Sequence, residues 1–244
     1  MATRKTRRTK TEADIKPQRK KFADDNNLKD FQPSKWQEEF IEVAANNRIT
    51  FTDSVSGVGK SSAALYYACK QYLVNPYLNI VIVRTPVEAG KDRIGFLPDD
   101  LDAKIEPHFA STRIILEEFL GKGKVENDLG KRIHFKIPNY MLGSTIRNSI
   151  LIIDEAQQLE PMLLKLLLER IGDGTTALVL GSTSQLYTSN NNGRSALKDA
   201  LERFFDKDGN PKYEGVGKYK YPLEAMMRDD IVKVVIRAYE GDDL

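Results

Sequence analysis

The stretch SVSGVGKSS at residues 54–62 ends in residue types that are suited to binding phosphate. Gly57 and Gly59 permit positive φ angles and let backbone N–H groups approach an anion closely. Lys60 would contact the β- and γ-phosphates, and the hydroxyl of Ser61 would bind Mg²⁺. These features predict a nucleotide site in which a loop contacts the phosphates.

The complete pattern for such a loop is GxxxxGK[ST], and Ser54 stands where the pattern has its first glycine. A plain turn between a strand and a helix would look similar in this stretch alone. We therefore treat the loop as a hypothesis that needs partner motifs. Its predicted phosphate-contacting residues are Ser56, Gly57, Val58, Gly59, Lys60, Ser61 and Ser62.

A second motif, ILIIDEAQ at residues 150–157, places an acidic pair directly after an apolar strand. Asp154 would hold the Mg²⁺ shell, and Glu155 would orient or deprotonate an attacking water. A strand that ends in two acids often has no role beyond solvation. The pair is more specific here because a phosphate loop lies upstream, and both motifs suit the carboxyl edge of a parallel sheet.

A third stretch, LVLGSTSQL at residues 178–186, would bring Gln185 near the γ-phosphate. An amide at that position can respond to hydrolysis. A strand that leaves into a polar turn would explain the same letters equally well.

The elements that must position these residues alternate along the chain. Apolar runs of strand length are separated by segments with helical spacing, which predicts an α/β fold with a mostly parallel sheet, and we find no internal repeat and no second domain. The predicted strands are 48–55, 79–86, 132–138, 149–156, 175–182 and a short one in KYKYPL (218–223), and the predicted helices are 33–47, 61–74, 106–121, 161–172, 193–205 and 229–240.

Composition and charge narrow the class of protein further. The 244 residues are 41% hydrophobic and 30% charged, as expected of a globular protein. Residues 1–22 contain nine Lys or Arg and two acids, so their charge is +7 and the rest of the chain carries −5 of the total +2. This composition predicts a disordered basic arm and linker over residues 1–31, which either solubilises the protein or attracts phosphate backbones.

Location is predicted from what the sequence lacks. A single cysteine, Cys69, fits a reducing compartment, and neither an apolar run of spanning length nor a secretory leader is found. We therefore expect a cytoplasmic protein without a membrane segment.

Several long blocks, in order, resemble the PhoH family of P-loop ATPases, which is related to superfamily 1 helicases. The resemblance covers about residues 33–240 and implies a single RecA-like domain over residues 32–244. Its blocks are VRTPVEAGKDRIGFLPDDLDAKIEPHF (83–109), YMLGSTIRNSILIIDEAQ (140–157), LLLERIG (166–172), RSAL (194–197) and MMRDDIVKVVIRAYE (226–240).

The resemblance implies roles for four further residues. Gln37 matches an adenine-reading glutamine, although an ordinary helix residue would fit as well. Arg228 matches an arginine finger, and its alternative is a surface arginine before a helix. Arg84 and Arg170 match family arginines that are candidates for γ-phosphate or nucleic-acid contact, and Arg170 could equally cap a helix. The resemblance also implies ATP and Mg²⁺ as cofactors. The catalytic residues would then be Glu155, Lys60, Gln185 and Arg228.

The chain also departs from the family pattern. Ser54 replaces a loop glycine, Ser182 replaces an acid, Leu142 and Ser144 replace two arginines, and Gln158 replaces an asparagine. The two lost arginines put nucleic-acid contact or ring geometry in doubt rather than nucleotide binding.

The resemblance implies a homo-oligomer, a hexameric ring, with RNA or single-stranded DNA as partner. Because the chain has room for only one RecA-like lobe, the finger must come from a neighbouring subunit or from the chain's own C-terminal segment. The leading hypothesis is a Mg²⁺-dependent ATPase that remodels RNA or single-stranded DNA. The alternatives are a nucleotide-gated binding ring with slow hydrolysis and no unwinding and, less favoured, a small-molecule kinase.

Overall fold

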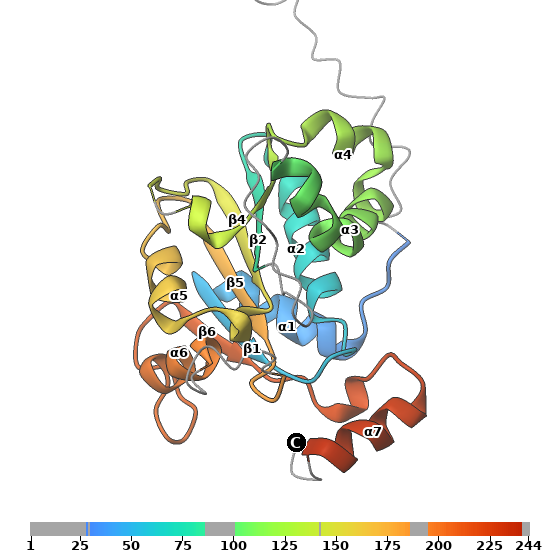
Figure 1. The fold of residues 1–244 in the computed structure, drawn as a ribbon, viewed down its shortest axis with the longest axis vertical. Helices are drawn as coiled ribbons and strands as arrows, with labels where there is room; N and C mark the ends of the chain where they lie inside the picture. The colour runs from blue at the N-terminus through green and yellow to red at the C-terminus, as the bar shows by residue number, and fades with distance from the viewer. Residues whose placement is uncertain (1–27, 29, 86–100, 142, 186–194, 241–244) are drawn as a thin grey trace, which may run out of the picture.

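The computed structural model describes residues 28, 30–85, 101–141, 143–185 and 195–240 of the chain (Figure 1). Six strands form one sheet in the order β3-β2-β4-β5-β1-β6, and all neighbouring strands are parallel. The predicted α/β fold with a mostly parallel sheet is confirmed. The strands are β1 (Ile49–Asp53), β2 (Asn79–Arg84), β3 (Ile133–Lys136), β4 (Ser149–Asp154), β5 (Thr176–Gly181) and β6 (Val216–Tyr219).

The strands read as continuous apolar runs because helices cover both faces of the sheet. In β4 every residue is buried, and successive side chains enter different cores: Ile150 and Ile152 lie in one hydrophobic cluster, and Leu151 and Ile153 lie in the other. A parallel sheet of this kind needs two helical layers, one on each side.

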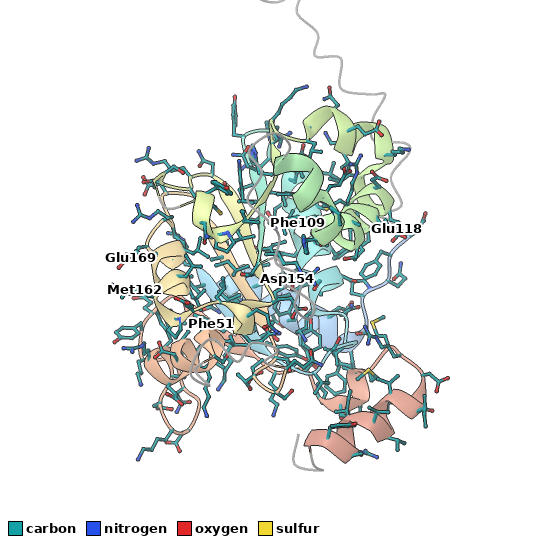
Figure 2. All side chains as sticks on the ribbon, viewed as in Figure 1. Phe51, Phe109, Glu118, Asp154, Met162 and Glu169 are labelled. Carbon is teal, nitrogen blue, oxygen red and sulfur yellow. The ribbon has the colours of Figure 1, made fainter. Side chains whose placement is uncertain are left out.

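Figure 1 shows those layers. The first core contains residues of α1 (Lys35–Asn46), α2 (Lys60–Val74), α3 (Leu101–Leu120) and α4 (Lys122–Asp128), and the second contains residues of α5 (Pro161–Leu168) and α6 (Ala196–Phe204). In Figure 2 Phe51 lies inside, whereas Met162 on α5 points outward; their exposed fractions are 0% and 61%. A last helix, α7 (Asp230–Glu240), is set off from the sheet beyond α1.

Short polar signals fix the helix starts. The Ser34 side chain and Gln37 form a capping box at the start of α1, and Pro161 opens α5 as predicted. Before α7, the Asp229 carboxylate accepts a hydrogen bond of 3.0 Å from the Ile231 N–H. This contact lies at residue 229, where the sequence predicted the start of the helix.

Several elements differ from the prediction in their boundaries, among them α5, which ends at Leu168 rather than at residue 172. α3 begins at Leu101 rather than at residue 106 and runs through Pro107, which costs the helix a hydrogen bond but does not end it. The short α4 follows at once from Gly121 and was not predicted. β6 begins at Val216, inside a segment predicted as a turn-rich link, because pairing with β1 aligns Val216 with Ile49.

The N-terminal boundary of the domain also needs correction. We predicted that residues 1–31 are an arm and linker, but Leu28 is only 8% exposed and belongs to the first core. The Phe31 ring packs 4.9 Å from the Tyr66 ring and 5.1 Å from the Phe119 ring, measured between centroids. The packed domain therefore includes Leu28, while the predicted basic arm at residues 1–22 lies outside the described residues. Within the described ranges, none of the helices is both long enough and apolar enough to cross a membrane.

Candidate nucleotide site

The loop between β1 and α2 lies at the carboxyl edge of the sheet, where ligands bind in parallel α/β folds. Gly57 and Gly59 have φ angles of 90° and 80°, which glycine adopts readily. A Cβ atom on Gly57 would lie 2.8 Å from the Met226 sulfur, and one on Gly59 would lie 2.6 Å from the Gln37 amide nitrogen. Both glycines are thus required by conformation and by close packing.

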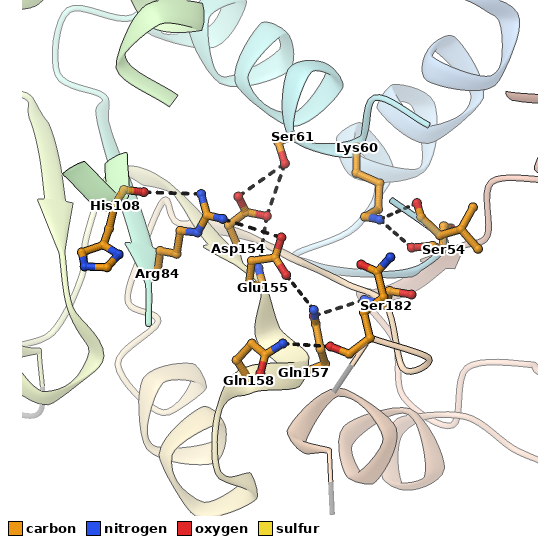
Figure 3. Close-up of polar contacts among 12 residues, drawn as sticks. Ser54, Lys60, Ser61, Arg84, His108, Asp154, Glu155, Gln157, Gln158 and Ser182 are labelled. Carbon is orange, nitrogen blue, oxygen red and sulfur yellow. Dashed lines mark hydrogen bonds and ion pairs between the residues drawn. The ribbon is translucent and has the colours of Figure 1, made fainter. Parts of the chain in front are cut away.

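Lys60 begins α2 and turns its ammonium group back toward the loop (Figure 3). Its Nζ donates hydrogen bonds to the carbonyl oxygens of Ser54 and Val55, the latter at 2.9 Å. Burial lowers the pKa of Lys60, and the nearby carboxylates of Asp154 and Glu155 oppose that shift. A buried ammonium that faces loop carbonyls is well placed to gain from an anionic ligand.

Ser61 and Asp154 come together from α2 and β4, as predicted for a Mg²⁺ site. The Ser61 hydroxyl lies 3.3 and 3.4 Å from the two carboxylate oxygens of Asp154. Asp154 is 8% exposed, and burial raises the pKa of its carboxyl group, an effect that a bound cation would offset. A hydroxyl and a carboxylate suit Mg²⁺, which takes its remaining ligands from phosphates and water.

No larger metal centre competes with this assignment. In the part of the chain that the structure describes, no three His, Cys, Asp or Glu side chains gather as metal ligands. Ser61 and Asp154 would supply only two ligands to a Mg²⁺ ion, so the ion would also need phosphate and water oxygens.

Glu155 is held in a conformation that is uncommon for a non-glycine residue, with φ at 55°. The Gln157 amide nitrogen donates to the Glu155 carboxylate at 2.6 Å, and an Arg84 nitrogen lies 3.8 Å from its other oxygen. These contacts hold the Glu155 carboxylate at the carboxyl edge of the sheet (Figure 3).

Gln157 joins Glu155 to the end of β5. Its side-chain oxygen accepts a hydrogen bond of 3.1 Å from the Ser182 backbone N–H. A Cβ atom on Gly181 would lie 2.5 Å from that same oxygen, so the strand end must be glycine for Gln157 to fit. The sequence motifs include Gln157 but assign it no role, and only the fold reveals this bridge.

The C-terminal segment, which we define as residues 221–228, lies against the phosphate loop of the same chain. The Met227 N–H donates to the Gly57 carbonyl at 3.0 Å. Arg228 follows, and its side-chain carbons approach Gly57, because a Cβ atom there would lie 2.9 Å from the Arg228 Cδ. Of the two sources predicted for the arginine, the structure brings Arg228 to the loop of its own chain.

These side chains surround one cavity of about 250 Å³. It brings together eleven predicted residues from four strand ends and the C-terminal segment. They are Ser56, Gly57, Gly59, Lys60, Ser61, Ser62, Arg84, Asp154, Glu155, Gln185 and Arg228. The cavity is also lined by Ser111, Thr112 and Ile115 of α3, which sequence reasoning missed because the position of a helix across a sheet depends on tertiary packing.

Three predicted residues do not line that cavity. Val58 is 1% exposed and packs in the first core, and the Arg170 side chain turns back to the Leu166 carbonyl at 3.4 Å. Gln37 is fully buried, its oxygen accepts from the Ser34 N–H at 3.0 Å and its nitrogen donates to the Gly59 carbonyl at 3.3 Å. Adenine recognition by Gln37 stays a prediction, whereas support of the loop is what its contacts show.

Two of the departures from the family pattern, Gln158 and Ser182, have contacts in the turn after β5. Gln158 donates from its amide nitrogen to the Gln185 carbonyl at 2.8 Å and so anchors the turn after β5. The Ser182 hydroxyl lies 2.9 Å from the Ser184 hydroxyl in the same turn. Ser144 does not line the cavity, and Leu142 lies outside the described residues.

The parallel sheet, the loop after β1 and the acidic pair after β4 define the class of P-loop ATPase domains. In agreement, the fold resembles the large terminase ATPase domain of Thermus phage P74-26 with a TM-score of 0.52, covering 88% of this chain and 92% of that one at 15% identity. That identity shows likeness of fold alone.

The chain belongs to the PhoH-like protein family, whose family model matches residues 32–240. It is 31% identical over 209 residues to a PhoH-like protein of Synechocystis, and 28% identical over 207 residues to protein PhoH of Escherichia coli K12. The alignments cover 85% and 83% of this chain but only 61% and 56% of those relatives.

Proposed function

We propose that the protein binds ATP with Mg²⁺ and hydrolyses it, which releases the γ-phosphate. One observation carries this proposal: Lys60, the pair of Ser61 and Asp154, Glu155 and Arg228 face a single cavity at the carboxyl edge of the sheet. Each belongs to a different part of the reaction, namely phosphate binding, metal binding, water activation and charge stabilisation. A structural turn would not require all four.

Ser61 and Asp154 would hold the Mg²⁺, which would neutralise charge on the phosphates when bound. Lys60 would exchange its loop carbonyl partners for phosphate oxygens. Glu155, fixed by Gln157 and Arg84, would orient the attacking water and accept its proton.

Arg228 would stabilise charge that develops on the transferred phosphoryl group. Arg228 lines the cavity from its own chain, and this supports the proposal that it acts in cis. Gln185 borders the same cavity and is proposed to respond to the γ-phosphate.

We further propose that the protein is a homo-oligomer, a hexamer, that acts on RNA or single-stranded DNA as a helicase or remodeller. Exposed apolar side chains on α7 support assembly: Ile231, Val234 and Val235 are each at least half exposed. The predicted basic arm would add affinity for either nucleic acid, independent of sequence.

The second candidate is a nucleotide-gated binding ring with slow hydrolysis and no unwinding. Ser182 favours it, because a serine stands at the end of β5 where the family pattern has an acid. Turnover that nucleic acid does not stimulate, together with an absence of unwinding, would support this candidate over the first.

The decisive experiment measures Mg²⁺-dependent ATP hydrolysis by the parent protein and by Lys60→Ala, with and without a panel of RNA and DNA strands. Lys165→Ala is the matched control, because Lys165 pairs with Glu169 on the outer surface of α5. We expect Lys60→Ala to lose turnover and the control to retain it. Equal turnover in all three proteins would contradict the site assignment.

A further inference from the structure

Ser54 is the first residue of the phosphate loop and is 4% exposed. Its N–H donates to the Gly181 carbonyl at 3.1 Å, which joins it to the end of β5. Its own carbonyl accepts from Lys60 Nζ. Its hydroxyl accepts a hydrogen bond of 2.8 Å from the Tyr221 backbone N–H. One residue thus contacts three parts of the site.

The hydrogen bond between Ser54 and Tyr221 lies just beyond the last paired residues of β1 and β6. Pairing between β1 and β6 stops at Thr52 and Tyr219, so the ladder provides no further acceptor. Tyr221 is 2% exposed, and water therefore cannot readily satisfy its N–H. The Ser54 hydroxyl supplies the acceptor, which a glycine at this position could not do.

The C-terminal segment is attached to the loop at two points. The first is the bond from Tyr221 to the Ser54 hydroxyl, and the second is the bond from the Met227 N–H to the Gly57 carbonyl. Arg228 directly follows the second point. The two attachments hold the segment that delivers Arg228 to the cavity.

We propose that Ser54 is a positioning residue that ties the phosphate loop to the C-terminal segment and thereby sets the place of Arg228; this inference rests on the proposed function. The serine is compatible with the turn, since Asn148 and Glu155 are the non-glycine residues with positive φ in the described ranges and Ser54 is not among them. Where the family pattern has a flexible glycine, Ser54 provides a hydroxyl that binds the C-terminal segment.

The first test measures hydrogen exchange of the backbone amides in residues 221–228, without nucleotide, in the full-length parent and in Ser54→Ala. We expect the variant to exchange about threefold to tenfold faster in this segment, since one ordinary hydrogen bond is lost, while β4 is unchanged. Unchanged exchange in residues 221–228 would overturn the proposal, whether or not the protein hydrolyses ATP.

The second test compares Ser54→Ala in the parent and in an Arg228→Ala background. If Ser54 acts through Arg228, Ser54→Ala lowers kcat by about threefold to tenfold in the parent and has no further effect in the Arg228→Ala background. Affinity for a non-hydrolysable ATP analogue stays within about twofold, because the loop glycines and Lys60 remain. An equal loss of kcat in both backgrounds would show a merely structural role and would overturn the proposal.

Thr50→Val is the matched control. Thr50 lies on β1, four residues before Ser54, and its buried hydroxyl has no hydrogen-bond partner among the described residues. Removing that hydroxyl should leave exchange in residues 221–228 and kcat unchanged. If the parent itself shows no Mg²⁺-dependent turnover, the proposed function fails, and the exchange measurement alone decides whether the attachment exists.

Discussion

Asp154 is a site residue whose charge is disfavoured by burial. Burial raises the pKa of its carboxyl group, so the folded protein holds a proton more tightly than the unfolded chain does. The contribution of Asp154 to the free energy of unfolding therefore falls as pH rises from the unfolded value through the folded one. At neutral pH and without a cation, Asp154 therefore contributes less to the free energy of unfolding than it does at low pH.

Asp154→Asn should therefore stabilise the protein while abolishing Mg²⁺-dependent turnover. The amide keeps an oxygen that can accept from Ser61 and from the Glu155 N–H, but it carries no buried charge. In chelator at pH 7 we expect the midpoint of thermal unfolding to rise by about 2–4 °C for each kcal/mol gained. The gain should shrink as pH is lowered and the parent carboxyl is protonated. A variant that melts lower than the parent at pH 7 would contradict this account.

Gln157 tests whether the conformation of Glu155 matters for the chemistry. Gln157→Met preserves length but removes the donor to Glu155 and the acceptor for Ser182. We expect kcat to fall by about tenfold or more, with ATP affinity unchanged, because Glu155 loses an oriented hydrogen bond while the phosphate loop is untouched. Parallel measurements of kcat and analogue affinity decide the matter: a loss confined to affinity would show that Gln157 shapes the cavity instead.

At the scale of elements, the sequence predicted most of the sheet because its strands are short apolar runs that a parallel sheet buries on both faces. It did not predict α4, and it placed the start of α3 at residue 106 rather than at Leu101. The part of the cavity formed by Ser111 and Thr112 could not be predicted either, because nothing in a single helix indicates which residue will face a loop on another element.

The start of α1 provides a test at this scale. Gln37 is both the reciprocal residue of the capping box with Ser34 and a donor to the Gly59 carbonyl, so the cap supports the phosphate loop. Ser34→Ala should lower the free energy of unfolding by about 1 kcal/mol and also weaken analogue binding. Ser195→Ala is the control, because Ser195 caps α6 with a comparable contact to the Lys198 N–H. It should lose similar stability without a change in affinity, and equal affinity losses in both variants would count against a special role for α1.

At the scale of the whole molecule, the sequence predicted most of the residues that gather at the cavity, but it left open whether Arg228 comes from the same chain. The contact that decides this, between Met227 and Gly57, is a backbone hydrogen bond between segments that are far apart in the sequence. No side-chain pattern encodes it. In the proposed mechanism Arg228 acts in cis, and assembly and catalysis would then be separable properties.

That separation gives the last prediction. The α7 stripe, which we define as Ile231, Val234 and Val235, lies at helical spacing and is 50–63% exposed, so it would be covered in the proposed homo-oligomer. Ile231→Lys combined with Val234→Lys should reduce the mass measured by light scattering to that of a monomer. Because each subunit keeps its own Arg228, turnover per chain should remain within about twofold of the parent.

Val74→Lys is the control for this double variant. Val74 is 78% exposed at the end of α2, away from the C-terminal segment, so the same change of charge there should leave the mass unaltered. If both proteins keep the mass of the parent oligomer, the α7 stripe is not the interface. If the double variant becomes a monomer without turnover, a neighbouring subunit contributes to catalysis, and the cis assignment of Arg228 fails. Mixing this monomeric variant with Arg228→Ala protein would then show whether Arg228 is the group that a neighbour supplies. Turnover would recover only if one chain supplies its arginine to the site of the other.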